Sequence, residues 1–155
     1  MSVSVSNRQR RVRVSVSRLA AVGRAGLASL RRGGRDLHVT VVGDREMQRL
    51  NRRYLGSRHS TDVLAFDLAG PGASPLLGEV IISADTAARQ AARVGVSVAL
   101  ELDLLLVHGL LHLAGYDDQE PVAARRMHER ARQILSAARR RALPARLWTG
   151  LLPAS

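Results

Sequence analysis

Apolar and polar residues alternate with two different periods along the chain, and these periods predict where strands and helices lie. Residues 10–17 place Val12, Val14 and Val16 on one face of an extended segment, which predicts a strand at or near a sheet edge. Three further apolar stretches predict the remaining strands, at residues 37–42, 61–67 and 77–83. A short connection rich in Gly and Pro separates the last two, so we expect them to form an antiparallel pair.

Apolar residues at helical spacing predict the other elements. They indicate helices at residues 19–30, 45–54, 86–94, 98–114 and 120–140. Strands and helices in this mixed order imply an α/β (α+β) fold, a single small mixed β-sheet of about four strands covered by about five helices. We expect residues 1–155 to form a single domain, with residues 1–9 and 142–155 as flexible tails.

The charged residues make the chain strongly basic. Basic side chains number 24 against 13 acidic ones, a formal net charge of +11 at pH 7, and every basic residue is arginine. The planar guanidinium group binds phosphate oxygens through two N–H groups at once. We therefore expect a polyanionic partner, with nucleic acid favoured over a membrane surface. Genome composition would explain arginine in place of lysine, but not the excess over Asp and Glu.

Several protein classes are disfavoured by what the sequence lacks. The absence of cysteine excludes a disulfide framework and a thiolate metal site. Residues 1–13 are polar and basic, without the apolar core of a signal peptide. The best apolar segment contains Glu101, Asp103, His108 and His112, which do not suit a membrane-spanning helix. We therefore expect a cytoplasmic protein without a membrane partner.

The candidate chemistry lies at the end of the helix predicted for residues 98–114. His108 and His112 are four residues apart, so both side chains lie on one helical face, about one turn apart. Two imidazoles in this arrangement can bind one metal ion. Gly115 favours a left-handed turn after the helix, and the returning chain would bring Asp118 within reach as a third ligand. Asp117 is the alternative third ligand.

A histidine pair at this spacing is weak support for a metal site when taken alone, because most such pairs are ordinary packing or surface residues. Here both histidines lie in a strongly apolar segment, where an imidazole without a partner carries a desolvation cost, so metal binding is favoured. The spacing also matches metzincin proteases. Those enzymes carry their glutamate base directly after the first histidine, where this chain has Gly109, so a peptidase is disfavoured.

The stretch HGLLHLAGYDD, residues 108–118, resembles the signature H-G-x-L-H-L-x-G-Y-D-H of the YbeY family, bacterial metal-dependent endoribonucleases involved in rRNA maturation. Other segments resemble motifs of the same family in the same order: LNRRYLG and TDVLAF, then LGEVIIS, then the final helix at residues 127–135. The resemblance extends over roughly residues 37–135.

The resemblance implies that His108, His112 and Asp118 hold one divalent ion per chain, predicted to be Zn²⁺, and act in catalysis through the water that the ion activates. Asp118 stands where the family has histidine. A carboxylate also binds zinc, and its harder, anionic oxygen makes Mn²⁺ the alternative metal. Asp117 matches the family's own aspartate, and we expect it to support the ligands by hydrogen bonding. The family's proposed catalytic arginine is replaced by Leu55, and Arg53 and Arg58 are the nearest substitutes.

A group of arginines precedes the strand predicted at residues 61–67. If that strand lies beside the metal, this group would follow an RNA backbone; its members are Arg49, Arg52, Arg53 and Arg58. The alternative for each is a solvated helix face.

The remaining charged residues receive weaker assignments. Asp62 and Glu79 are candidates for supporting the metal ligands or accepting a proton, although carboxylates at strand ends are more often caps. We expect Glu101 and Asp103 to face solvent, and we treat the other histidines as structural: His38, His59 and His128.

The predicted function is therefore a metal-dependent, single-strand-specific endoribonuclease acting in rRNA maturation and ribosome quality control. Its expected partners are rRNA and the small ribosomal subunit or assembly proteins. Two alternatives stay open: a non-catalytic rRNA-binding assembly factor with a structural metal, and a metal hydrolase acting on a substrate other than RNA.

Overall fold

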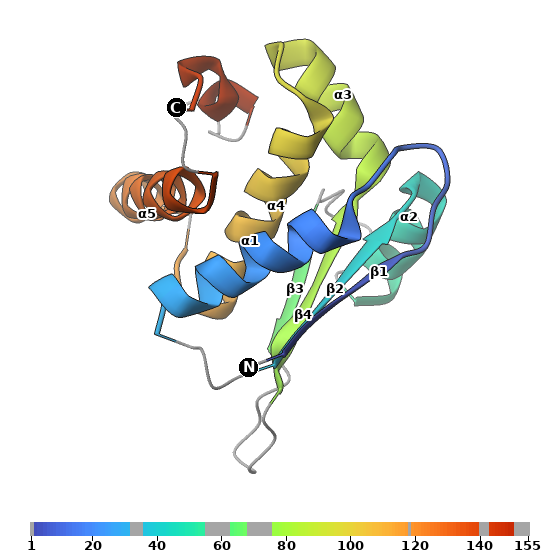
Figure 1. The fold of residues 1–155 in the computed structure, drawn as a ribbon, viewed down its shortest axis with the longest axis horizontal. Helices are drawn as coiled ribbons and strands as arrows, with labels where there is room; N and C mark the ends of the chain where they lie inside the picture. Colours follow the sequence, from blue (N-terminus) through green and yellow to red (C-terminus); the bar gives the residue numbers. More distant parts are fainter. Residues whose placement is uncertain are drawn as a thin grey trace.

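Four strands form one mixed sheet in the order β1-β2-β4-β3 (Figure 1). The strands are β1 (Ser2–Asn7), β2 (Asp36–Val42), β3 (Val63–Asp67) and β4 (Leu76–Ser83). β1 and β4 each pair with β2 in parallel. β3 pairs with β4 antiparallel, which confirms the one pairing predicted from the sequence. This computed structural model describes residues 2–31, 36–54, 63–67, 76–117, 119–139 and 143–150.

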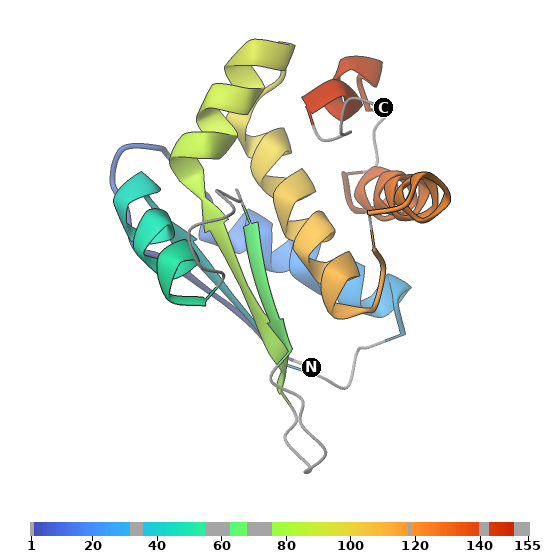
Figure 2. The same cartoon turned by 180° about the vertical axis from the view of Figure 1, so that it is seen from behind.

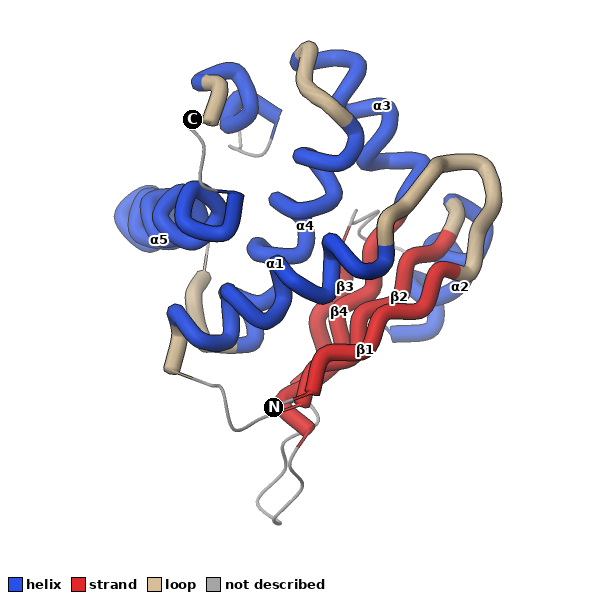
Figure 3. Tube along the Cα trace, viewed as in Figure 1, coloured by secondary structure: helices blue, strands red, loops and turns tan. Residues whose placement is uncertain are grey.

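The helices are distributed unequally over the two faces of this sheet. They are α1 (Val16–Ser29), α2 (Asp44–Tyr54), α3 (Ala84–Val94), α4 (Val98–Leu113) and α5 (Pro121–Arg139), followed by the 3-10 helix η2 (Ala145–Gly150). α1 and α4 cover one face, and α2 lies on the other (Figures 2 and 3). α5 packs outside α1 and α4, so the molecule is layered from α2 through the sheet to α5. The predicted fold class, a small mixed sheet with five helices, is confirmed.

Local sequence explains where several helices begin and end. The hydroxyl groups of Ser15, Ser83 and Ser97 each accept a hydrogen bond from the backbone N–H three residues further on, which caps α1, α3 and α4. Gly95 ends α3 in the left-handed conformation, with φ of 78°. Serine caps of this kind supply partners for helix N–H groups that have none within the helix.

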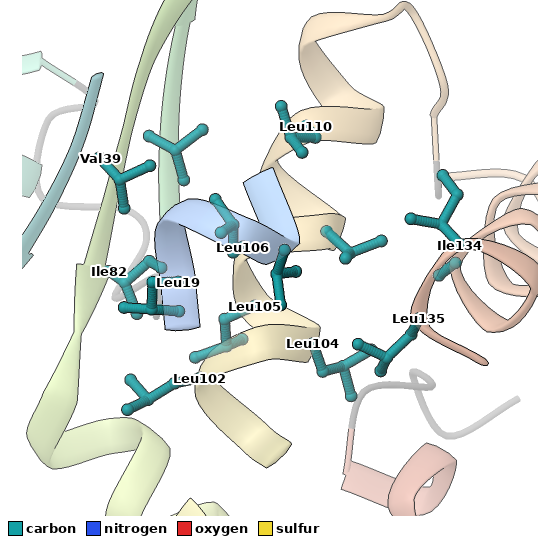
Figure 4. Close-up of a cluster of buried hydrophobic side chains, with 14 of the residues drawn as sticks. Leu19, Val39, Ile82, Leu102, Leu104, Leu105, Leu106, Leu110, Ile134 and Leu135 are labelled. Atoms are coloured by element: carbon teal, nitrogen blue, oxygen red, sulfur yellow. The ribbon is translucent and has the colours of Figure 1, made fainter. Parts of the chain in front are cut away.

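α4 is the centre of the hydrophobic core. It is apolar on nearly all sides, a pattern typical of a helix that other elements surround. Leu102, Leu105 and Leu106 are buried with Val39 and Ile82 of the sheet, while Leu104 lies toward Leu135 of α5 (Figure 4). The sheet, α1, α3, α5 and η2 therefore pack around α4 in one hydrophobic core.

α4 approaches the sheet closely at Gly109. A Cβ atom at this position would lie 2.7 Å from Cγ1 of Val80 in β4 and 3.2 Å from Cγ2 of Val63 in β3. Valine is rigid at χ1, so neither neighbour can turn away at low cost. A residue without a side chain is required here for α4 to pack at this depth.

The N-terminal prediction was wrong in its placement of the first strand. Residues 2–7 form β1 instead of a flexible tail, and residues 10–17 are not a strand, because α1 begins at Val16. Both stretches alternate valine with polar residues, so the period does not distinguish them. Val3 and Val5 pack against the core while β1 pairs with β2, and this tertiary pairing selects the earlier stretch.

The C-terminal tail prediction was wrong for the part that the structure describes. η2 folds back onto the core, with Leu147 fully buried and Trp148 only 9% exposed. Large apolar side chains stabilise such a return because burying each of them contributes on the order of 1.5–3 kcal/mol. Residues 140–142 and 151–155 lie outside the described residues.

The prediction that Glu101 and Asp103 face solvent was also wrong. Both are buried, with Asp103 only 1% exposed. Oδ2 of Asp103 accepts from Nε of Arg18 in α1 at 3.1 Å and from Nη1 of Arg139 in α5 at 2.7 Å. Burial raises the pKa of Asp103, and the two guanidinium groups act in the opposite direction. This carboxylate links three helices.

Among the helices of the described residues, none alone combines the length and apolar composition needed to cross a membrane. α3 and α4 meet both conditions only as a pair, and they are bent by 118° at the break between them.

The close packing at Gly109 predicts the effect of adding one methyl group. Alanine is a better helix former than glycine by roughly 0.5–1 kcal/mol, so in open space Gly109→Ala would stabilise the protein. At this position, however, the added methyl group would clash with Val80. We therefore expect Gly109→Ala to lower the free energy of unfolding by about 1–3 kcal/mol instead of raising it. Urea denaturation of the two proteins measures the difference, and a more stable variant would contradict the close approach.

Candidate metal centre

His108 and His112 converge at the end of α4. The Nε2 atoms of the two rings lie 2.9 Å apart, the ring centroids are 4.5 Å apart, and the ring planes meet at 82°. Both side chains are half-buried. The four-residue spacing on a regular helix accounts for this convergence, since it leaves the two side chains adjacent on one face.

This geometry suits two ligands of one metal ion. In a tetrahedral zinc site with Zn–N distances of about 2.0–2.1 Å, two nitrogen ligands lie about 3.3 Å from each other. The Nε2 atoms would have to separate by only about 0.4 Å, a change that small χ rotations supply. The pair therefore fits a shared ion without movement of the helix backbone.

The chain reverses directly after the histidines. The N–H of Gly115 donates to the carbonyl of His112 at 3.1 Å, and the N–H of Tyr116 donates to that of Leu111 at 2.9 Å. Gly115 has φ of 97°, a left-handed conformation that glycine adopts without steric cost. Together these bonds form a Schellman motif, which ends the helix and turns the chain back toward it.

The third ligand predicted from sequence, Asp118, lies outside the described residues. Within the described part of the chain, no third His, Cys, Asp or Glu joins the histidine pair to form a metal-binding group. Asp117, the alternative ligand, is exposed, and its Oδ1 accepts from the N–H of Gln119 at 3.0 Å. This hydrogen bond holds the Asp117 side chain against the turn.

Gly109 follows the first histidine, at the position where metzincins carry their glutamate base. Because this position faces Val80 and Val63, a side chain here would meet the sheet. The close packing of α4 therefore gives a physical reason for the missing carboxylate.

Glu79 is not brought to the histidine pair. Side chains alternate between the faces of a strand, and Val80 contacts α4 at Gly109, so Glu79 points toward the opposite face of the sheet. There its neighbours across the sheet are His38 in β2 and Phe66 in β3. Nδ1 of His38 is 2.8 Å from Oγ of Ser4, so this histidine belongs to a polar row on that face.

The predicted RNA-binding arginines lie on α2. Arg49, Arg52 and Arg53 are exposed, whereas Arg58 and Asp62 lie outside the described residues. The strand that follows them, β3, begins at Val63, whose side chain lies against Gly109 beside the first histidine. β3 thus begins beside the histidine-bearing end of α4.

Sequence analysis did not single out the arginines of α5 that lie near this turn. Tyr116, four residues after His112, lines a hollow together with Arg125, Arg126 and Arg130. The available signal was their spacing, which places them on one face of the helix predicted at residues 120–140.

The fold and the histidine pair define an α/β protein with a candidate metal centre at the end of its central helix. Comparison with known proteins makes the class more specific. The family model described as Endoribonuclease YbeY matches residues 4–139, and the chain belongs to this family.

Individual relatives agree with this membership. The Endoribonuclease YbeY of Anaeromyxobacter sp. (strain Fw109-5) is 44% identical over 153 residues, which covers 94% of this chain and 80% of that protein. The Endoribonuclease YbeY of Geobacter metallireducens is 40% identical over 149 residues, covering 92% and 99%. A solution structure of TM1509 from Thermotoga maritima matches with a TM-score of 0.61 at 22% identity, covering 96% of this chain and 90% of that one, and supports the fold.

Proposed function

We propose that this protein is a metal-dependent, single-strand-specific endoribonuclease that acts in rRNA maturation and ribosome quality control. The chain belongs to a family of endoribonucleases, so the reaction class is internal cleavage of RNA. The observation that carries the metal dependence is the convergence of the two Nε2 atoms at 2.9 Å, at the end of a buried helix and directly before a chain reversal.

His108, His112 and Asp118 would hold the ion in this proposal. Zinc, when bound, activates water and stabilises negative charge on a phosphoryl oxygen. The histidines present neutral ring nitrogens from a rigid helix, and Asp118 would supply a carboxylate oxygen from the turn beyond it. Mn²⁺ is the alternative ion because the aspartate is a harder ligand than the histidine that it replaces. Asp117 and Asp62 would support the ligands by hydrogen bonding.

The arginines of α2 and the loop after it would bind the substrate backbone. Arg49, Arg52 and Arg53 are exposed, and Arg58 follows them in the sequence. The net charge of +11 favours association with any polyanion, and rRNA is the expected one. The further partners in this proposal are the small ribosomal subunit or assembly proteins, in the cytoplasm and away from membranes.

A second candidate is a non-catalytic rRNA-binding assembly factor with a structural metal. This candidate is favoured by two observations: Gly109 faces the sheet, and Glu79 lies on the opposite face of the sheet from α4. Both observations leave the histidine pair, in the described part of the chain, without a carboxylate base of the kind that metzincins use. A metal hydrolase acting on another substrate is the third candidate.

Metal content tests the ligand assignment without relying on activity. We expect purified wild-type protein to contain about one equivalent of zinc, measured by inductively coupled plasma mass spectrometry. His108→Ala and Asp118→Ala should each lose most of this zinc, because a site with only two protein ligands binds zinc far more weakly. His38→Ala is the matched control and should keep the metal, since His38 contacts Ser4 on the sheet. Full metal content in both ligand variants would refute the site.

Cleavage of labelled single-stranded RNA distinguishes the three candidates. We expect internal cuts that a chelator abolishes and added zinc restores, with His108→Ala at least about 100-fold slower because the ion is lost. A duplex of the same sequence is the control and should stay intact. If the protein binds the RNA without cutting it, the assembly factor is supported instead. If it neither binds nor cuts the RNA, the remaining candidate is a hydrolase that acts on another substrate.

Salt dependence of RNA affinity tests the arginines of α2 and its following loop. We expect simultaneous replacement of Arg49, Arg52, Arg53 and Arg58 by alanine to reduce the slope of log affinity against log salt by about 2–3, since each phosphate contact on a single strand contributes roughly 0.7. Fluorescence anisotropy at several salt concentrations measures it. An unchanged slope would assign these arginines to an ordinary solvated surface.

A further inference from the structure

The outer side of α5 carries two neighbouring hollows, here together called the α5 groove. The first has a volume of about 400 Å³ and is lined by Tyr116, Arg125, Arg126 and Arg130. The second, of about 750 Å³, lies between α5 and η2 and is lined by His128, Arg132, Leu143 and Trp148, among others. Glu129 and Gln133 line both hollows, so the two hollows are adjacent on the surface of α5.

The first hollow is strongly basic. Its three arginines face a single carboxylate, that of Glu129, and both oxygens of this carboxylate accept from Nη2 of Arg132, at 2.8 and 3.0 Å. The acid is therefore neutralised within the groove. Arg130 is held in position, since its guanidinium donates to the carbonyl of Ser29 at 2.6 Å and to Gln133 at 3.1 Å. Arg125 and Arg126 are exposed, so their charges are accessible to an incoming anion.

The second hollow has mainly apolar walls and an aromatic side. The rings of His128 and Trp148 pack edge to face, with centroids 4.5 Å apart and planes at 64°. Burial lowers the pKa of His128, which favours the neutral ring. Leu143 and the rings form a surface on which a flat, uncharged group can pack, while Arg132 and Gln133 supply hydrogen-bond donors at its edge.

We propose that the α5 groove binds single-stranded RNA, with phosphates along Arg125, Arg126 and Arg130 and an unpaired nucleobase in the hollow beside Trp148. A basic track with an aromatic hollow at one end is the combination that single-stranded nucleic acids require, because paired bases cannot reach such a hollow. This inference rests on the proposed function. It names a second substrate-binding surface, separate from the arginines of α2.

The position of the groove connects it to the candidate metal centre. Tyr116 is the last residue of the turn that begins at the histidines, and it forms the first wall of the groove. α5 and α2 lie on opposite sides of the sheet and α4 (Figure 3). An RNA strand that occupies both surfaces would pass the end of α4, where the histidines lie.

The chain offers a direct probe of the groove, since Trp148 is its only tryptophan. In the presence of chelator, so that no RNA is cut, titration with single-stranded RNA should change the Trp148 fluorescence with the same midpoint as anisotropy of labelled RNA. RNA of the same length with abasic sites should bind more weakly and change the fluorescence less. Unchanged fluorescence at saturating RNA would overturn the proposal, and so would an equal change with polyglutamate.

Matched charge variants test the basic hollow. We expect Arg125→Ala with Arg126→Ala to weaken RNA binding about tenfold at moderate salt and to lower the salt slope by about 1.4, the loss of two phosphate contacts. Arg13→Ala with Arg93→Ala is the control, because these exposed arginines lie before α1 and in α3, away from α5, and their replacement removes the same charge. If both double variants weaken RNA binding equally, the effect comes from net charge alone and the proposal is overturned.

The outcomes separate this inference from the proposed function. If the protein cuts RNA with chelator-sensitive activity but shows neither a fluorescence change nor a selective loss in the α5 variant, only the groove assignment fails. If wild-type protein binds no RNA by anisotropy, the proposed function fails together with it.

Discussion

The packing of α4 against the sheet is the constraint on which the rest of the structure depends. This helix is apolar almost all round, and it reaches the core depth observed only because Gly109 presents no side chain to Val80 and Val63. The same contact sets the rotation of the helix about its axis. With Gly109 against the sheet, His108 and His112 are carried together to a half-buried face, where their nitrogens converge. Core packing and candidate chemistry are therefore determined by one interface.

Charged side chains have two different roles in this molecule, one on its surface and one in its interior. Most arginines are exposed and give the surface its positive field, whereas Asp103 lies in the interior, where it accepts from Arg18 and Arg139. Burying that carboxylate costs free energy, which the two guanidinium groups offset. In return, the side chain joins α1, α4 and α5 at a single atom, Oδ2, and α5 is held in the layer where it carries its own basic groove.

Much of the fold was predictable because periodicity reports burial. The strands at 37–42 and 77–83, the antiparallel pair and the five helices were all confirmed to within a few residues. The errors share a cause. Residues 2–7 and 10–17 have equivalent alternation, and only pairing with β2 decides between them. Likewise Glu101 and Asp103 are charged, and their burial depends on arginines far away in the sequence. At the candidate site, the histidine pair followed from local spacing, whereas the face on which Glu79 lies could not be read from the sequence, because it is set by the contact of Val80 with α4.

The sequence by itself determined what depends on neighbours a few residues apart. These features are the spacing of the two histidines, the glycine that reverses the chain after them, the serine caps, and the arginine excess. Only the tertiary structure decided which valine-rich stretch joins the sheet, which acid is buried, and which arginines gather along α5. The physical reason is range: helix spacing and turn geometry arise within one or two turns of chain, whereas strand pairing and charge burial depend on residues that meet only when the core has closed.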